Sequence, residues 1–318
     1  MTEAKHPLDL PIDLQEALDA TVADVSAYQG QGVLPSYLPS LTQVNPRKLG
    51  IAVALGDGRT FAAGDADEAF SIQSISNVFS LSLALQHVGG SLWNHVGKEA
   101  SGSAVNSVVQ LELEKGKPRN PLINAGAMVV DDQLIGHDSP DVAVNELMEF
   151  LRERCGDCTV EIDQSVAISE SQGGSLNRSL AHYMAAFNNL SHPVEDVVSV
   201  YFRQCAIAMT CRQLAKAALY LAFDGTDPLT GDQILLASRA RRILALMVTC
   251  GHYDNSGDFA FRIGLPGKSG VSGGILAIVP RVGAIAAWSP GLNSAGTSLT
   301  GSIMLEKLVE RTGWSIFA

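Results

Sequence analysis

The hydrophobic residues follow two different spacings along this chain. Strand-like apolar runs lie near its two ends, at residues 48–55, 59–63, 275–279 and 282–288. Turns at Asp57-Gly58 and Pro280-Arg281 join these runs in pairs. The pattern therefore predicts two hairpins that are far apart in the sequence.

Between these runs the apolar spacing becomes helical. Residues three or four positions apart predict helices at residues 142–154, 178–190, 194–204, 210–223 and 237–248, with flanking helices at 12–28 and 298–312. A sheet built from both chain ends would then be covered by the first and last helices. We predict an α/β sheet domain of residues 1–70 and 255–318, an inserted helical domain of residues 71–254, and a site in the cleft between them.

Composition narrows the class of protein. The chain has 318 residues, of which 46% are hydrophobic and 17% charged, as in a globular protein with a core. Its net charge of -11 repels phosphate backbones, so we expect no nucleic-acid partner. We see neither a run of about 18 apolar residues nor a basic start followed by an apolar segment, so we expect no membrane association and a cytoplasmic location.

The cysteines favour the same compartment. There are five, an odd number, and we see no secretory signal, so we expect reduced thiols. Cys155 and Cys158 have the spacing of a metal or redox pair, but no second pair or nearby histidine cluster completes a zinc site. We therefore expect neither a metal ion nor a cofactor.

Two glycine motifs do not have the context that their chemistry needs. Gly267-Lys268-Ser269 resembles the end of a phosphate-binding loop, but the position of the required first glycine holds Arg262. The segment 270–274 matches G-x-S-x-G, yet a strand is predicted after it where a nucleophile elbow needs a helix, and no histidine follows His252. Neither motif indicates function by itself.

Ser74 lies in a more informative context. An apolar stripe predicts a buried helix that begins beside it: Val78, Leu81, Leu85 and Val88. Free N–H groups and the helix dipole favour an oxyanion in such a first turn. Ser74 and Asn77 are three positions apart and share a helix face, where S-x-x-K enzymes hold a serine nucleophile and a lysine base. A helix-capping serine would produce the same local pattern.

The remaining motifs follow the order of the penicillin-recognising fold. Lys268-Ser269-Gly270 resembles its K-T-G element, and Tyr201 lies in the helical segment that holds its middle motif. The whole set resembles the bacterial and mitochondrial glutaminases of the β-lactamase-like fold, over residues 15–315. The segments that carry the resemblance are 73–76, 120–127, Ser169-Glu170, Asn177-Arg178, Tyr201, 247–254 and 267–275.

The resemblance implies a fold, an activity and a set of site residues. The fold is α/β plus α, similar to β-lactamases and penicillin-binding proteins, and the substrate is L-glutamine. Ser74 is implied as the acyl-forming nucleophile, with an oxyanion hole formed by its own N–H and that of Val271. The implied pocket residues are Asn124, Glu170, Asn177, Tyr201 and Tyr253. It also implies a homodimer or homotetramer.

The chemistry of these side chains suits glutamine, although each has a structural alternative. Glu170 can pair with the substrate ammonium, asparagine amides can hold polar groups, and tyrosines can relay protons. Alternatively, Asn124 could cap a helix, Glu170 could pair with Arg178, and Tyr201 and Tyr253 could be core aromatics with satisfied hydroxyls.

Asn77 departs from the family pattern, which has lysine at this position. Asparagine cannot accept a proton near neutral pH, although it can still hydrogen-bond Ser74. Lys268 could supply a nearby positive charge. We expect the fold and the pocket to survive while activation of Ser74 suffers. The change is either an engineered inactivation or a natural loss of turnover.

Three functions remain open on the sequence alone. The first is hydrolysis of L-glutamine to L-glutamate and ammonia through a serine acyl-enzyme. The second is a catalytically silent glutamine-binding protein on the same scaffold. The third is a β-lactam-recognising serine enzyme, against which the Asn124 and Glu170 segments argue because they suit an amino-acid pocket.

Overall fold

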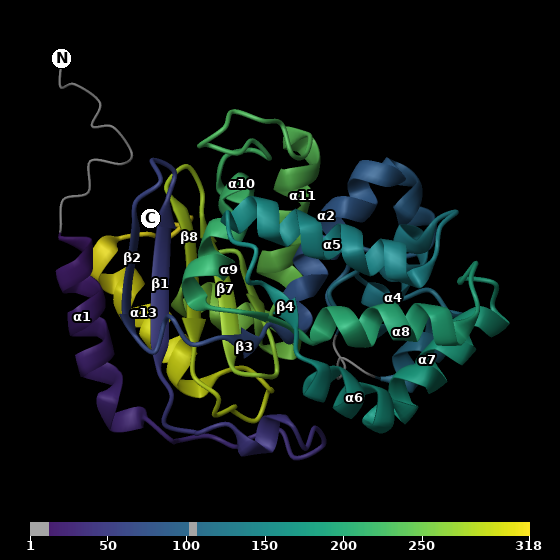
Figure 1. Cartoon of the computed structure of the whole chain (residues 1–318), viewed down its shortest axis with the longest axis horizontal. Helices are drawn as coiled ribbons and strands as arrows, with labels where there is room; N and C mark the ends of the chain where they lie inside the picture. Colours follow the sequence, from purple (N-terminus) through teal and green to yellow (C-terminus); the bar gives the residue numbers. More distant parts are fainter. Residues whose placement is uncertain (1–12, 102–106) are drawn as a thin grey trace.

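An antiparallel sheet joins the two ends of the chain (Figure 1). The computed structural model describes residues 13–101 and 107–318. The sheet consists of β1 (Gly50–Leu55), β2 (Thr60–Gly64), β6 (Gly267–Ser269), β7 (Gly274–Val279) and β8 (Gly283–Trp288). Its order is β2-β1-β8-β7-β6, so that β1 pairs directly with β8. The predicted sheet from both chain ends is confirmed.

The central strands are apolar along their whole length because both faces of the sheet are covered. Ile51 and Val53 share a core with α1 (Leu14–Val25) and α13 (Leu299–Thr312). Ala52, which points to the other face, belongs to the larger core of the helical part. Strands buried on both faces give continuous apolar runs instead of strict alternation, and the sequence has such runs.

Helices make up the middle of the chain. They are α2 (Ser76–His87), α3 (Val108–Leu113), α4 (Asn124–Ile135), α5 (Pro140–Cys155), α6 (Gln164–Gly173), α7 (Ser175–Ala186), α8 (Val194–Cys205), α9 (Cys211–Ala217), α10 (Leu219–Ala222), α11 (Ala237–Cys250) and α12 (Ser256–Arg262). Short 3₁₀ turns lie before β1, as η1 (Ser26–Tyr28) and η2 (Leu41–Gln43), and in the middle of the chain, as η3 (Gln73–Ile75), η4 (Gly89–Asn94) and η5 (Tyr253–Asn255). Within the described residues, none of these helices has the length and apolar character of a membrane span.

The end signals of α5 illustrate how local sequence sets these boundaries. Ser139 caps its N-terminus by accepting from the Val142 N–H, and Pro140 occupies the first turn, where its missing N–H costs nothing. Gly156 ends the helix in the left-handed conformation, at φ 67°.

The middle of the chain also contains structure that the helical pattern does not predict. A small second sheet has the order β3-β5-β4, from β3 (Phe70–Ser71), β4 (Glu161–Ile162) and β5 (Ile207–Met209). Strands this short contain too few residues for an alternating pattern. The predicted helix 210–223 is divided into α9 and α10, and α9 packs on β1 and β8.

The division into a sheet domain of residues 1–70 and 255–318 and a helical domain of residues 71–254 stays a prediction. Residues 1–12 of the predicted sheet domain lie outside the described part of the chain.

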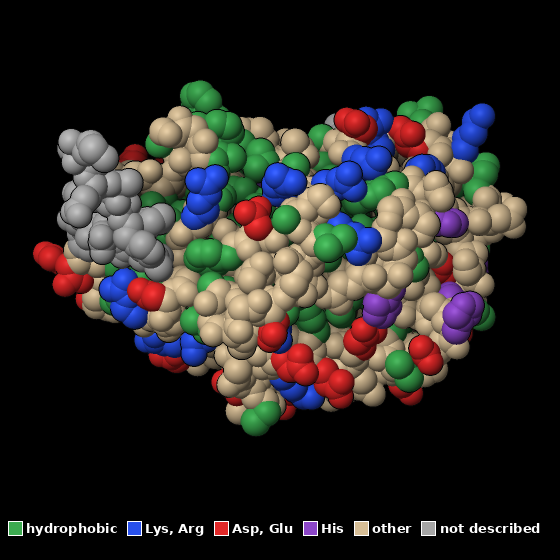
Figure 2. Space-filling model, turned by 90° about the horizontal axis from the view of Figure 1, so that it is seen from above, with side chains coloured by type: hydrophobic (Ala, Val, Ile, Leu, Met, Phe, Trp, Pro, Cys, Tyr) green, Lys and Arg blue, Asp and Glu red, His purple; other side chains and the backbone are tan. Residues whose placement is uncertain are grey.

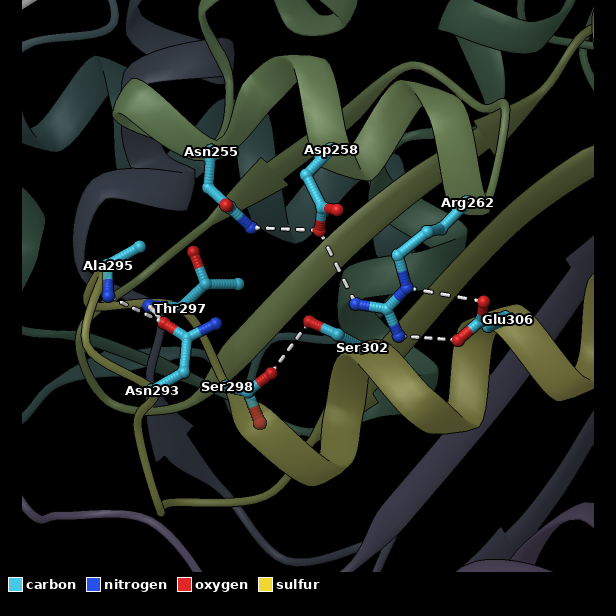
Figure 3. Close-up of polar contacts among 9 residues, drawn as sticks. All are labelled: Asn255, Asp258, Arg262, Asn293, Ala295, Thr297, Ser298, Ser302 and Glu306. Atoms are coloured by element: carbon cyan, nitrogen blue, oxygen red, sulfur yellow. Dashed lines mark hydrogen bonds and ion pairs between the residues drawn. The ribbon is translucent and has the colours of Figure 1, made fainter.

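Polar contacts hold α12 on α13 (Figure 3). Arg262 forms an ion pair with Glu306 of α13 and a second one, at 3.4 Å, with Asp258 one turn earlier. The Asn255 side chain donates to the same Asp258 carboxylate. These contacts anchor the segment between Tyr253 and β6, whose two ends carry the predicted site residues Tyr253 and Lys268.

Candidate active site

A hollow of about 380 Å³ lies where η3 and the loop after β6 meet the helices α4, α6, α7 and α8. The volume suits a small molecule. The seven residues predicted to act as nucleophile or to line a glutamine pocket all contribute to its walls: Ser74, Asn124, Glu170, Asn177, Tyr201, Tyr253 and Val271. Asn77 and Lys268, the other two predicted residues, are buried outside this lining.

Ser74 lies on a tight turn that leads into α2. Gln73, which precedes it, has the left-handed φ of 51°, a strained value that is typical of functional turns. The backbone N–H of Ile72 donates a hydrogen bond to the carbonyl of Ile207 in β5 at 2.8 Å. A Cβ atom on Gly270 would lie 2.5 Å from the Ile72 carbonyl, so only glycine lets this loop reach the serine turn. No side chain caps η3 or α2 in the described structure, and their start borders the hollow, so the positive end of the α2 dipole favours an anion there.

Tyr253 is the direct partner of the Ser74 hydroxyl. Its phenol interacts with the hydroxyl groups of Ser74 and Ser269. Burial raises the pKa of this phenol, while the two hydroxyl groups act in the opposite direction. Tyr253 also has a left-handed φ, 58°, so that both residues flanking the candidate nucleophile in space are strained.

Lys268 is buried behind the Tyr253 ring. Its ammonium Nζ lies 4.4 Å from the centroid of that ring and donates to the Ser269 carbonyl at 2.6 Å. The side chain has no solvent exposure, and this burial lowers its pKa to about 7. The amine therefore exchanges a proton readily near neutral pH.

Glu170 presents an unpaired carboxylate to the hollow. It is 7% exposed, and burial raises its pKa to about 7 despite a hydrogen bond from Gln73. In the described residues, no lysine, arginine or histidine forms an ion pair with it. Arg178 pairs instead with Glu195 at 3.1 Å, so the alternative in which Glu170 pairs with Arg178 is wrong. A bound cation would stabilise the ionised form of Glu170.

Two asparagines meet in the lining of the same hollow. The Asn124 Nδ2 donates to the Asn177 Oδ1 at 3.0 Å. Asn124 is the first residue of α4, whose N-cap is Ile123 and has no side-chain cap, so the capping alternative for Asn124 is wrong. No lysine or arginine lines the hollow within the described part of the chain. An anionic group there would depend on amide donors and on the N-terminus of α4.

Asn77 does not contact Ser74 as expected. Its Nδ2 donates to the Leu122 carbonyl at 3.4 Å, and its Oδ1 accepts from Gln204 Nε2 at 3.2 Å. Asparagine has one methylene group, so its amide reaches these neighbours and not the serine hydroxyl. The expectation that Asn77 hydrogen-bonds Ser74 is wrong.

Five further side chains in the lining are not among the predicted site residues: Tyr37, Leu38, Gln73, Leu176 and Cys205. Tyr37 comes from the irregular segment before β1, and its side chain remains 63% exposed. Cys205 interacts with Tyr201, and burial raises the pKa of its thiol. Cys205 is thus an inert part of the wall, and Tyr201 is both a buried aromatic residue and part of the lining.

Comparisons with known proteins agree with this arrangement. The family model described as Glutaminase matches residues 32–317. A glutaminase of Rhizobium rhizogenes (strain K84) is 55% identical over 305 residues, which cover 96% of this chain and 99% of the relative.

Solved structures are similar over the same length. A probable glutaminase, ybaS, has a TM-score of 0.90 at 35% identity and covers 96% of this chain and 99% of its own. A probable glutaminase from Bacillus subtilis, complexed with 6-diazo-5-oxo-L-norleucine, has a TM-score of 0.87 at 34% identity, covering 96% and 97%.

Proposed function

The chain belongs to the glutaminase family, and from that premise we propose that it binds L-glutamine and hydrolyses its side-chain amide through Ser74. The observation that carries the proposal is the meeting of two features in one hollow. The Ser74 hydroxyl interacts with the buried phenol of Tyr253, and the buried carboxylate of Glu170, which has no ion-pair partner among the described residues, faces the same space.

The hollow offers a partner for each polar group of glutamine. The ammonium pairs with Glu170, which gains the counter-charge that it lacks in the protein. The α-carboxylate accepts hydrogen bonds from Asn124, Asn177 and the uncapped start of α4. This orientation leaves the side-chain amide for Ser74. The complex of the Bacillus subtilis relative with 6-diazo-5-oxo-L-norleucine, an amino acid, supports a pocket of this kind.

The reaction has two steps. Ser74 Oγ attacks the amide carbon while its proton passes to the ionised form of Tyr253, which is scarce because burial raises the pKa of the phenol. The carbonyl oxygen becomes negative near the N–H groups of Ser74 and Val271. The C–N bond then breaks, and ammonia leaves with a returned proton. Water attacks the resulting ester, releasing L-glutamate and restoring the Ser74 hydroxyl.

Asn77 sets the rate of this chemistry in our proposal. It carries no group that accepts a proton, and its amide is occupied by Leu122 and Gln204. Tyr253 with Lys268 behind it is then the remaining proton relay, and neutral phenol is a weak base. We therefore propose slow turnover with intact binding.

A silent glutamine-binding protein is the second candidate. The same engagement of Asn77 favours it, because the hollow keeps its binding groups while the nucleophile loses its usual base. Measured ammonia release distinguishes the two candidates.

Replacement of Ser74 by alanine tests the function. We expect glutamine to bind the purified protein and a low rate of ammonia release that Ser74→Ala abolishes. Glutamine should still bind Ser74→Ala in calorimetry. Ammonia release that persists in Ser74→Ala would contradict the assignment of Ser74 as the nucleophile. If glutamine bound neither protein, the assignment of L-glutamine as the substrate would be wrong. Hydrolysis of nitrocefin in place of glutamine would favour a β-lactam-recognising enzyme.

The cellular setting follows from the same proposal. We place the protein in the cytoplasm as a homodimer or homotetramer, since reduced cysteines fit that compartment and the family resemblance implies such oligomers. Light scattering of the purified protein would establish the oligomer.

A further inference from the structure

A second hollow, of about 480 Å³, lies between α11 and the segment around η4. It shares no lining residue with the hollow at Ser74. Helix α11 contributes Arg242, Ala245, Leu246 and Thr249. These positions are three, four and seven residues apart, so they form one stripe along the helix. The facing wall consists of Trp93 and Lys98.

The charges of this hollow are all positive. Lys98 Nζ lies 5.3 Å from the centroid of the Trp93 ring, in a cation–π contact. Neither Lys98 nor Arg242 forms an ion pair with any acidic side chain of residues 13–101 and 107–318, and no carboxylate lines the hollow. Glu99 does not line the hollow, and its charge helps to raise the pKa of the Cys250 thiol.

The face around the hollow is mixed in charge. Seen from above, it carries Lys and Arg side chains beside hydrophobic ones, with some Asp and Glu side chains among them (Figure 2). Such a mixture of cations and apolar groups is suited to an organic anion more than to a metal ion or an uncharged lipid.

Trp93 adds a flat platform with an unused donor. Its side chain is partly buried, and its indole Nε1 is enclosed with no hydrogen-bond acceptor in the described residues. Its backbone carbonyl accepts from Lys117 at 2.9 Å, which fixes this segment. Because this N–H is enclosed, Trp93 would contact a ligand through its ring and not through Nε1.

We propose that this hollow binds a small planar organic anion, such as an aromatic carboxylate. Its anionic group pairs with Arg242 and Lys98, and its ring lies against Trp93 with Ala245 and Leu246 as the floor. This site is separate from the proposed hydrolysis of glutamine, and neither depends on the other.

The test uses indole-3-acetate as an anionic probe and indole-3-acetamide as its neutral counterpart. In titration calorimetry with the whole chain, we expect saturable binding of the acetate and at least about tenfold weaker binding of the acetamide. Saturating L-glutamine should leave the affinity for the acetate unchanged.

Two variants and a matched control complete the test. Arg242→Gln and Lys98→Gln change exposed side chains, so the fold should be retained. Each should lower the affinity for the acetate at least about tenfold. Arg241→Gln alters the exposed neighbouring arginine, which does not line the hollow. The affinity of this variant for the acetate should lie within about twofold of that of the unchanged chain.

Four results would overturn the proposal. The first is that the acetate does not bind at millimolar concentration, and the second is that the acetamide binds equally well. The third is that Arg242→Gln and Lys98→Gln both bind the acetate as the unchanged chain does. The fourth is that L-glutamine displaces the acetate. The last would locate the probe at Ser74 instead.

Discussion

The Oδ1 of Asn77 accepts a hydrogen bond from Nε2 of Gln204 at 3.2 Å, and this contact turns the Asn77 amide toward α8 and away from Ser74. The two residues are 127 positions apart in the chain. Asn77 is 1% exposed, so water cannot replace its partners freely. Residue 77 thus supports the packing of α2 on its neighbours and leaves Ser74 to Tyr253.

Asn77→Lys should raise the rate of ammonia release at least about a hundredfold, with little change in glutamine affinity. A lysine side chain is longer and ends in an amine that accepts the Ser74 proton when burial keeps it neutral. Steady-state ammonia release and calorimetry on both proteins would measure the two quantities.

Asn77→Met is the matched control, because it supplies length without an amine. It should remain as slow as the unchanged chain. If Asn77→Met and Asn77→Lys raised the rate of ammonia release equally, the volume of the side chain at residue 77 would matter and not its basic group. No gain from Lys would place the base elsewhere.

Glu170→Gln should weaken glutamine binding at least about tenfold, because the substrate ammonium loses its charged partner. Calorimetry would measure the affinity. Glu195→Gln is the control, since that exposed carboxylate pairs with Arg178 and does not line the hollow. Similar affinities of the two variants would remove Glu170 from the site.

Glutamine affinity should rise with pH and then level off. The pKa of Glu170 is raised to about 7, so this carboxyl is mostly protonated at pH 6 and mostly ionised at pH 8. Only the ionised form pairs with ammonium, which predicts a rise of about tenfold over that interval. The rise should vanish in Glu170→Gln, and a pH dependence that persists there would belong to another group.

Tyr253→Phe should lower kcat about a hundredfold or more while glutamine still binds. The variant removes the phenol that interacts with Ser74 and Ser269 and keeps the ring beside Lys268. Tyr183→Phe, on α7 outside the hollow, should leave the rate unchanged. Full activity of Tyr253→Phe would show that the proton takes another route.

Lys268→Met should flatten the dependence of stability on pH. The folded pKa of Lys268 is lowered to about 7 from 10.5, so between these values the unfolded state binds the extra proton. Stability of the unchanged chain should therefore rise with pH across that window because of this lysine. Urea unfolding at pH 7.5 and 9.5 would measure the rise.

The control for this stability measurement is Lys216→Met, which removes an exposed lysine of α9. It should keep the slope of the unchanged chain. The same slope in Lys268→Met would mean that burial does not lower the Lys268 pKa.

Much of the fold could be predicted because it depends on local patterns. The apolar runs of β1, β7 and β8 and the spacing in α8 and α11 are properties of neighbouring residues, and the structure has these elements within a few positions. The small sheet β3-β5-β4 could not be predicted, since strands of two or three residues carry no period.

The sequence by itself determined which chemical groups this protein carries, including Ser74, Glu170 and an asparagine at residue 77. Only the tertiary structure decided what those groups do to one another. It brought Ser74 beside Tyr253, turned Asn77 toward Gln204 and left Glu170 without a counter-ion among the described residues. The physical reason is that hydrogen bonds and pKa values depend on distance and burial, which arise when segments far apart in the chain pack together.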